Sequence, residues 1–197
     1  QLQQHYQASA LSSHGLRIFT SLDPWVQHQA DTAMVEQVLK LNQRHGKIQG
    51  LQGALVVSHR DSGELLALVG DHNGGYAGHN WALDRSRQVG SLLKPVIHLA
   101  ALETGQYSPA TIINDAPVSL QQSDGTLWQP QNYDRKSHGK VPMYEALAMS
   151  YNQANVRLGM QVGVDKVLQQ LKKMGVDQFI PAYPSALLGA VEMSPLQ

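Results

Sequence analysis

The sequence predicts an α+β (α/β) fold, and three observations lead to this prediction. Apolar residues recur at helical spacing after Asp23. Two apolar runs flank the turn-forming residues 61–63, as in a β-hairpin. Several shorter helical segments then follow between residues 91 and 175. The 197 residues suit one domain and are enough to bury a sizeable core.

The first predicted helix begins at Asp23 and Pro24 and ends near Gly46. Asp23 suits the N-cap position and Pro24 the first helical position. One face of this helix is expected to pack inward, because apolar residues repeat along it: Val26, Ala30, Ala33, Met34, Val38 and Leu41. Residues 1–14 are polar and rich in glutamine and serine, which predicts a linker or the beginning of a domain.

The predicted hairpin pairs residues 53–60 with residues 64–70 across a turn that contains Gly63. A glycine-containing loop is expected at 73–78.

A helix is predicted over about 91–103. The stretch 106–141 is expected to be loop-rich because three prolines interrupt it: Pro109, Pro117 and Pro130. A short helix is predicted over 142–148, followed by helices at about 154–161 and 165–174.

Composition excludes several functional classes. Lysine plus arginine equals aspartate plus glutamate at 15 each, which argues against a nucleic-acid binder with a basic surface. The absence of cysteine excludes thiolate catalysis, disulfides and cysteine zinc sites. The nine histidines show no paired metal-ligand spacing, so neither a metal nor a cofactor is expected.

The string GSLLKP at 90–95 places the hydroxyl of Ser91 and the amine of Lys94 three residues apart. Residues at i and i+3 share a helix face, so one turn brings a nucleophile and a possible base together. Lysine can act as that base only where burial or a positive dipole favours the neutral amine. The alternative is a serine at the start of a helix with an unrelated surface lysine.

A second S-x-x-K string runs from Ser137 to Lys140 in a polar loop, with a glycine between the partners. Nothing in that loop would fix the geometry or bury the lysine, so we expect a structural role only. The first string begins an apolar helix, although Pro95 disfavours helical geometry at Lys94.

Ser150, Tyr151 and Asn152 follow at a predicted helix junction. A second hydroxyl near Lys94 could relay a proton, and an asparagine amide could donate to a substrate carbonyl. The alternative is that both polar residues only cap helices, as Gln153 and Asn155 could also do.

Five segments occur in the order and with the spacing of a known family: GLRIFTSLDP (15–24), RQVGSLLKP (87–95), WQPQNYDR (128–135), SYNQANV (150–156) and LLGAVEMSP (187–195). With them, the chain resembles the bifunctional class A penicillin-binding proteins, in particular the 1b-like enzymes of Gram-negative bacteria. That family uses S-x-x-K, S-x-N and K-T-G motifs. The resemblance implies a serine β-lactamase or penicillin-binding-protein transpeptidase-like fold.

The resemblance also implies roles for the matched residues. Ser91 would be the acylated nucleophile, Lys94 the general base and Ser150 a proton shuttle. Asn152 would hold the substrate amide, and Tyr151 would border the cleft. The backbone N–H of Ser91 would be one oxyanion donor.

The implied reaction is D,D-transpeptidation of peptidoglycan stem peptides that end in D-Ala-D-Ala. Attack would release the terminal D-Ala, and an amine of a neighbouring stem would take the acyl group. β-Lactams would be trapped at the same serine. Cell-wall synthesis proteins are the expected partners, at the periplasmic face of the bacterial inner membrane.

The sequence lacks the third motif, because neither K-T-G nor K-S-G occurs in it. We therefore expect residues 15–197 to be the N-terminal portion of a transpeptidase domain, with the helices and the first hairpin. The later sheet strands, the glycosyltransferase domain and a membrane anchor would lie outside it, so the fragment itself would be soluble.

The sequence leaves two other hypotheses about function open. One is a hydrolase, either a D,D-carboxypeptidase or a β-lactamase, although neither Glu145 nor Glu192 has the motif of a deacylating residue. The other is a non-catalytic penicillin-binding or scaffold fragment. Labelling with a fluorescent penicillin would separate these readings.

Overall fold

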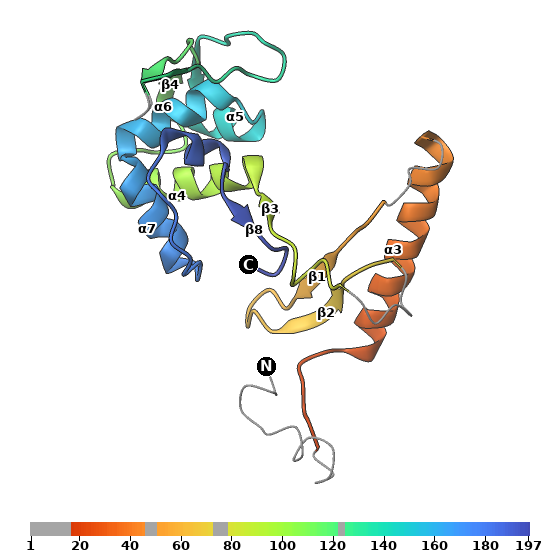
Figure 1. The fold of residues 1–197 in the computed structure, drawn as a ribbon. Coiled ribbons are helices and arrows are strands. Elements are labelled where there is room, and N and C mark those ends of the chain that lie inside the picture. Colours follow the sequence, from red (N-terminus) through yellow and green to blue (C-terminus); the bar gives the residue numbers. More distant parts are fainter. Residues whose placement is uncertain (1–16, 46–50, 73–78, 122–124) are drawn as a thin grey trace. The chain divides into compact units, whose positions relative to one another are not determined.

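The computed structural model describes residues 17–45, 51–72, 79–121 and 125–197. The chain divides into two compact units, residues 1–82 and 83–197, and each is described by itself (Figure 1). The predictions for the linker 1–14, the helix stop at Gly46 and the loop 73–78 lie outside the described residues. Whether 15–197 form a portion of one domain stays a prediction.

The first unit begins with helix α3 (Pro24–His45), as the sequence predicts. Asp23 is its N-cap: its Oδ1 accepts hydrogen bonds from the backbone N of Trp25 at 2.8 Å and of Val26 at 3.0 Å. These bonds satisfy two N–H groups that a helix start leaves without partners.

The predicted hairpin is confirmed as strand β1 (Leu55–Ser58) paired antiparallel with strand β2 (Leu65–Val69). Gly63 takes the left-handed conformation in the turn, with φ +71°. Helix α3 packs on this hairpin through a small core of Ala30, Ala67 and Val69. The predicted inward face of α3 is wrong at two positions, because Ala33 and Leu41 are exposed.

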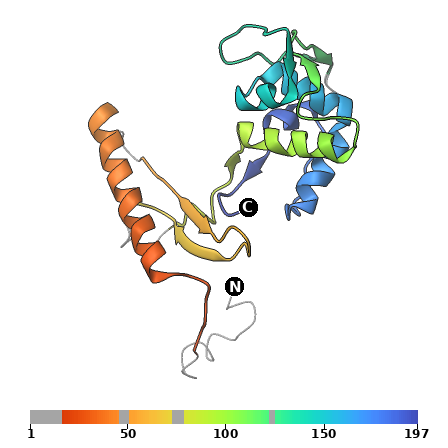
Figure 2. The ribbon, with the colours of Figure 1, turned by 180° about the vertical axis from the view of Figure 1, so that it is seen from behind.

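The second unit is built around one apolar helix, α4 (Lys94–Glu103). It packs against α5 (Met143–Ala148), α6 (Asn152–Val162) and α7 (Val164–Lys173). Figures 1 and 2 view the chain from opposite sides, and both show α4 beside α6 and α7. Burial of Leu93, Ile97, Ala101 and similar residues forms the core of this unit.

The helix predicted over 91–103 starts differently from a regular α-helix. Gly90–Leu93 form a 3₁₀ turn, η1, and the α-helix begins only at Lys94. Pro95 therefore lies in the first turn of α4, where no hydrogen bond to its missing N–H is needed. Lys94 keeps helical dihedrals (φ −58°, ψ −41°) despite the proline that follows it.

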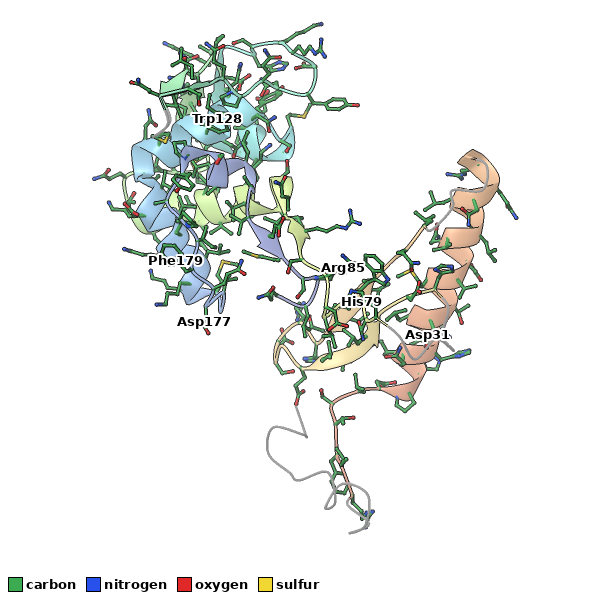
Figure 3. The ribbon with its side chains drawn as sticks, in the orientation of Figure 1. Asp31, His79, Arg85, Trp128, Asp177 and Phe179 are labelled. Carbon is green, nitrogen blue, oxygen red and sulfur yellow. The ribbon has the colours of Figure 1, made fainter. Side chains whose placement is uncertain are left out.

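The region predicted as loop contains short strand pairs that the sequence analysis missed. Strand β4 (Ile112–Asn114) pairs with β7 (Lys140–Pro142), and β5 (Leu120–Gln121) pairs with β6 (Leu127–Trp128), both antiparallel. Strands of two or three residues are too short to show an alternating pattern. Trp128, labelled in Figure 3, is half-buried against the core.

The end of the chain returns to the start of α4. After the 3₁₀ turn η2 (Pro184–Leu188), strand β8 (Glu192–Met193) pairs with β3 (Arg87–Gln88) just before η1. Across the described ranges, no helix is both long and apolar enough to cross a bilayer.

Candidate active site

The structure brings together four of the five residues singled out from the sequence. Ser150 Oγ lies 3.2 Å from Ser91 Oγ and 2.8 Å from the amine of Lys94. Lys94 Nζ also donates to the backbone oxygen of Ser150 at 2.6 Å and to Oδ1 of Asn152 at 2.6 Å. Two hydroxyls, one amine and one amide thus form a continuous hydrogen-bonded set.

Lys94 lies almost completely inside the protein, with 1% of its surface exposed. Burial lowers the pKa of the amine from 10.5 to about 8, because the charged form loses hydration. Its three hydrogen bonds match the three N–H groups of an ammonium ion. Because burial lowers its pKa to about 8, this lysine can lose its proton near neutral pH.

The link between Ser91 and Lys94 runs through Ser150. The three acceptors of Lys94 Nζ belong to Ser150 and Asn152, whereas Ser91 Oγ is hydrogen-bonded to Ser150 Oγ. The i,i+3 spacing thus places the two groups on the same side of the turn, and a second hydroxyl bridges them. The S-x-x-K spacing alone does not indicate this bridge; the expectation of a second hydroxyl near Lys94 came from the string at 150–152.

Ser150 adopts a backbone conformation that L-residues rarely take, with φ +56°. Such a residue costs about 1–3 kcal/mol, and the surrounding structure must hold it. It occupies the turn between α5 and α6, where its N–H donates to the carbonyl of Leu147 at 3.0 Å. In this conformation, Ser150 Oγ lies between Ser91 Oγ and Lys94 Nζ and is hydrogen-bonded to both.

Two residues that the sequence analysis did not single out, Asn132 and Asp115, cap the start of α6. Asn132 Oδ1 accepts from the backbone N of Asn152 at 2.6 Å and of Gln153 at 3.2 Å. Asp115 Oδ1 accepts from the backbone N of Ala154 at 2.9 Å. Helix α6 has no cap from its own N-cap residue, so side chains distant in sequence hold Asn152 in place.

Asp115 and Asn132 are themselves buried and hydrogen-bonded, at 0% and 4% exposed. Asn132 Nδ2 donates to Asp115 Oδ2 at 2.6 Å, and the same oxygen accepts from the backbone N of His138 at 3.0 Å. The only sequence signal for Asn132 was its place in the family-like string at 128–135. Asp115 had no such signal.

A close approach of two glycines fixes the turn that carries Ser91. Gly90 has φ +56° and its N–H donates to the carbonyl of Gly189 at 3.1 Å. A Cβ at Gly189 would collide with the backbone oxygen and nitrogen of Gly90. This contact explains why the segment 187–195 matters to the site although it carries no catalytic side chain.

Asn152 keeps hydrogen-bonding capacity for a ligand. Its Nδ2 donates one hydrogen to the carbonyl of Gln131 at 2.7 Å, and an amide nitrogen carries two hydrogens. Tyr151, the fifth predicted residue, is half-buried and its side chain is no part of the hydrogen-bonded set. Its ring stacks on His138, with centroids 4.1 Å apart and planes 15° apart.

The second S-x-x-K string has different surroundings. Lys140 is exposed at the start of β7. Ser137 Oγ donates to the backbone oxygen of Asp115 at 2.7 Å. These are structural contacts, in agreement with the prediction for this loop.

Gln153 and Asn155 are buried in α6 and do not cap it with their side chains. Capping by these two residues was one of the alternatives that the sequence allowed. Their side chains bond within the unit instead, Gln153 to the carbonyl of Pro130 at 3.4 Å.

Comparison with known proteins identifies the sequence family. Residues 53–189 match the penicillin binding protein transpeptidase domain. Penicillin-binding protein 1B of Vibrio cholerae is 45% identical over 186 residues, which cover 93% of this chain and 24% of that protein. Penicillin-binding protein 1B of Escherichia coli is 40% identical over 188 residues, covering 93% and 22%. The chain thus spans about a quarter of the length of these relatives.

Solved structures agree with the predicted fold class. The crystal structure of penicillin-binding protein 1A from Haemophilus influenzae gives a TM-score of 0.68 at 31% identity, over 74% of this chain and 22% of that one. The PonA1 protein of Mycobacterium tuberculosis, in complex with penicillin V, gives 0.78 at 22% identity, over 99% and 52%. This second likeness concerns the fold alone. By its match over residues 53–189 and its identity to these relatives, the chain belongs to the penicillin-binding protein transpeptidase family.

Proposed function

We propose that this chain carries the nucleophilic part of a D,D-transpeptidase that cross-links peptidoglycan stem peptides through a serine acyl-enzyme. One observation carries the proposal: a buried lysine of lowered pKa is hydrogen-bonded to Ser150, which is hydrogen-bonded to the exposed Ser91. An activated serine needs such a base, and the arrangement supplies it. Membership of the family supports peptidoglycan as the substrate class.

In the acylation step, neutral Lys94 accepts a proton from Ser150 Oγ while Ser150 accepts the proton of Ser91. The freed Ser91 oxygen attacks the carbonyl carbon between the two terminal D-Ala residues, and the carbonyl electron pair moves onto its oxygen. When that pair returns, the C–N bond breaks. The leaving amine takes the proton from Lys94 through Ser150, and free D-Ala departs.

In the second step, an amine of a neighbouring stem attacks the ester carbonyl of the acyl-enzyme. It gives a proton through Ser150 to Lys94 and forms the new amide bond. Ser91 leaves with a proton returned by the same route. The relay thus runs in both directions, which suits an enzyme whose leaving group and acceptor are both amines.

Two further groups bind the substrate in this proposal. The remaining N–H of Asn152 donates to a backbone carbonyl of the stem peptide, and the Tyr151 ring borders the peptide. The N–H of Ser91 lies at the start of η1, where helical N–H groups have no intrahelical partner, and it donates to the developing oxyanion.

β-Lactams are the expected inhibitors, because their strained amide would acylate Ser91 in the same way. The names of the relatives and the penicillin V complex of a fold relative support this expectation. We propose the periplasmic face of the inner membrane as the place of the reaction, because the family resemblance implies it. Cell-wall synthesis proteins remain the proposed partners.

A hydrolase is the second candidate, and the structure gives it less support. A β-lactamase needs a carboxylate that activates water beside the acylated serine. Among the described residues, the side-chain hydrogen bonds of Ser91, Lys94 and Ser150 involve neither Glu145 on α5 nor Glu192 on β8. A D,D-carboxypeptidase would use the same four groups with water as acceptor.

The test uses the protein at its natural length with a synthetic stem peptide ending in D-Ala-D-Ala and an amine acceptor. Transpeptidation predicts equal amounts of free D-Ala and cross-linked product, and Ser91→Ala should give neither. Free D-Ala with only hydrolysed donor would identify a carboxypeptidase. Absence of both products and of fluorescent-penicillin labelling in folded protein would favour a non-catalytic fragment.

A further inference from the structure

A second polar contact joins α4 to α6 one helical turn below the reactive groups. His98 follows Lys94 by four residues, and Asn155 follows Asn152 by three, so each lies on the same helix face as its partner in the site. His98 Nε2 and Asn155 Oδ1 are 2.7 Å apart. Both residues are buried, at 5% and 0% exposed. The reaction proposed above uses neither.

The amide of Asn155 also holds the backbone on both sides of Ser150. Its Nδ2 donates to the carbonyl of Ala146 at 2.9 Å and to that of Tyr151 at 2.6 Å. Ala146 belongs to α5, and Tyr151 immediately precedes α6. One buried side chain therefore ties together the two ends of the turn in which Ser150 has φ +56°.

These contacts determine which nitrogen of His98 carries a hydrogen. An amide nitrogen has two hydrogens, and Asn155 donates both to carbonyl oxygens. Its Oδ1 can then only accept, so Nε2 of His98 must be the donor. Burial lowers the pKa of His98 and outweighs the opposing effect of the Asn155 hydrogen bond, so the neutral ring with its hydrogen on Nε2 is favoured.

We propose that His98 is a positioning residue: through Asn155 it holds the Ser150 turn so that Ser150 Oγ stays between Ser91 and Lys94. Without the His98 donor, Asn155 Oδ1 would be buried without a partner, and its amide would be free to rotate away from the two carbonyls. The left-handed Ser150 would then lose a support that offsets its strain. The inference rests on the proposed acylation of Ser91.

The first experiment compares His98→Phe with the wild type at natural length, using a fluorescent penicillin. Phenylalanine keeps an apolar ring but has no N–H. The acylation rate at saturating penicillin is expected to fall about 10- to 100-fold, because small misplacement of a relay group is costly. The dissociation constant of the initial complex is expected to stay within about twofold.

A rescue variant and a matched control separate positioning from general destabilisation. In His98→Gln the side-chain amide extends about as far as Nε2 and can still donate to Asn155, so most of the acylation rate should return. Val167→Ala removes fully buried methyl groups in α7, a helix that contributes no residue to the hydrogen-bonded set of the site. It should lower the melting temperature as much as His98→Phe while leaving acylation unchanged.

If His98→Phe does not fold, His98→Asn takes its place, because the asparagine amide is too short to reach Asn155. Acylation of His98→Asn should then be slow, whereas acylation of His98→Gln should be fast. The inference is overturned if the donor-lacking variant acylates at the wild-type rate, if Val167→Ala is slowed equally, or if His98→Gln gives no rescue. Failure of the wild type to label at Ser91 would instead refute the proposed function.

Discussion

The pattern S-x-x-K occurs twice in this chain, and the structure gives the two copies opposite surroundings. Lys94 is 1% exposed and its amine makes three hydrogen bonds, whereas Lys140 is exposed in β7. Ser91 Oγ is hydrogen-bonded to the hydroxyl of Ser150, whereas Ser137 Oγ donates to the backbone carbonyl of Asp115. The same S-x-x-K spacing therefore occurs once with a buried, hydrogen-bonded lysine and once with an exposed lysine.

The difference indicates that the spacing alone does not provide the surroundings that a serine nucleophile needs. A lysine is a useful base only where burial lowers its pKa, and its serine needs a geometry that a rigid turn maintains. At the first string, the apolar helix α4 supplies the burial and the Gly90–Gly189 contact fixes the turn. In the second string Ser137 lies in a loop and Lys140 is exposed at the start of β7, so it has neither feature.

The largest expected effect comes from removing the two lysines in turn. Lys94→Ala should slow acylation by a fluorescent penicillin about 1,000-fold or more, because the base is lost. Lys140→Ala is the matched control and should acylate at the wild-type rate. A comparable loss in both variants would mean that the burial of Lys94 does not distinguish the two strings.

The relay hydroxyl should matter next. Ser150→Ala leaves Lys94 and Ser91 without the bridging oxygen, and acylation should fall about 100-fold. Ser137→Ala should leave the acylation rate unchanged, as measured by stopped-flow with the same penicillin. If Ser150→Ala acylates normally, Lys94 must reach Ser91 directly and the bridging geometry plays no part.

The acylation rate should also depend on pH through Lys94. The active form is the neutral amine, so the rate rises as the pH passes upward through the pKa of about 8. Between pH 7 and pH 9 the neutral fraction grows about tenfold. A rate profile with a midpoint near the ordinary lysine value of 10.5 would show that burial does not tune this residue.

Asp115 links the second string to the start of α6, and changing it should have the smallest effect on chemistry. Its carboxylate accepts from three N–H groups, so in Asp115→Asn the new amide nitrogen would face at least one of these donors. Unfolding should become easier by about 1–3 kcal/mol, measured by urea denaturation. Acylation should fall only a few-fold, through the loosened start of α6.

A wild-type urea midpoint in Asp115→Asn would show that the buried carboxylate is not needed. Ser137→Ala provides the comparison, because it removes one hydrogen bond to the Asp115 carbonyl and should destabilise by only about 1 kcal/mol.

Local patterns predicted much of the fold. Asp23 and Pro24 marked the start of α3, and Gly63 marked the hairpin turn. The two-residue strands β3 and β8 had no detectable signal, because they are defined by pairing between residues about a hundred positions apart. The exposure of Leu41 likewise depends on what the hairpin covers, which helical periodicity cannot show.

The candidate site, like the fold, was predicted only in part. Ser91, Lys94, Ser150 and Asn152 were found from motifs and from the family resemblance. The supporting residues Asp115, Asn132, His98 and Asn155 were not, because a buried polar residue is recognised only by its partners in space. The left-handed Ser150 also had no sequence signal, since serine carries no preference for that conformation.

The central claim is that burial and the bridging hydroxyl make Ser91, and not Ser137, the nucleophile. Peptide mass mapping after reaction with penicillin tests it most directly, on the wild type and on Ser91→Ala. The account predicts one adduct, on the peptide that contains Ser91, and none in the variant. An adduct at Ser137, or labelling that survives in Ser91→Ala, would contradict it.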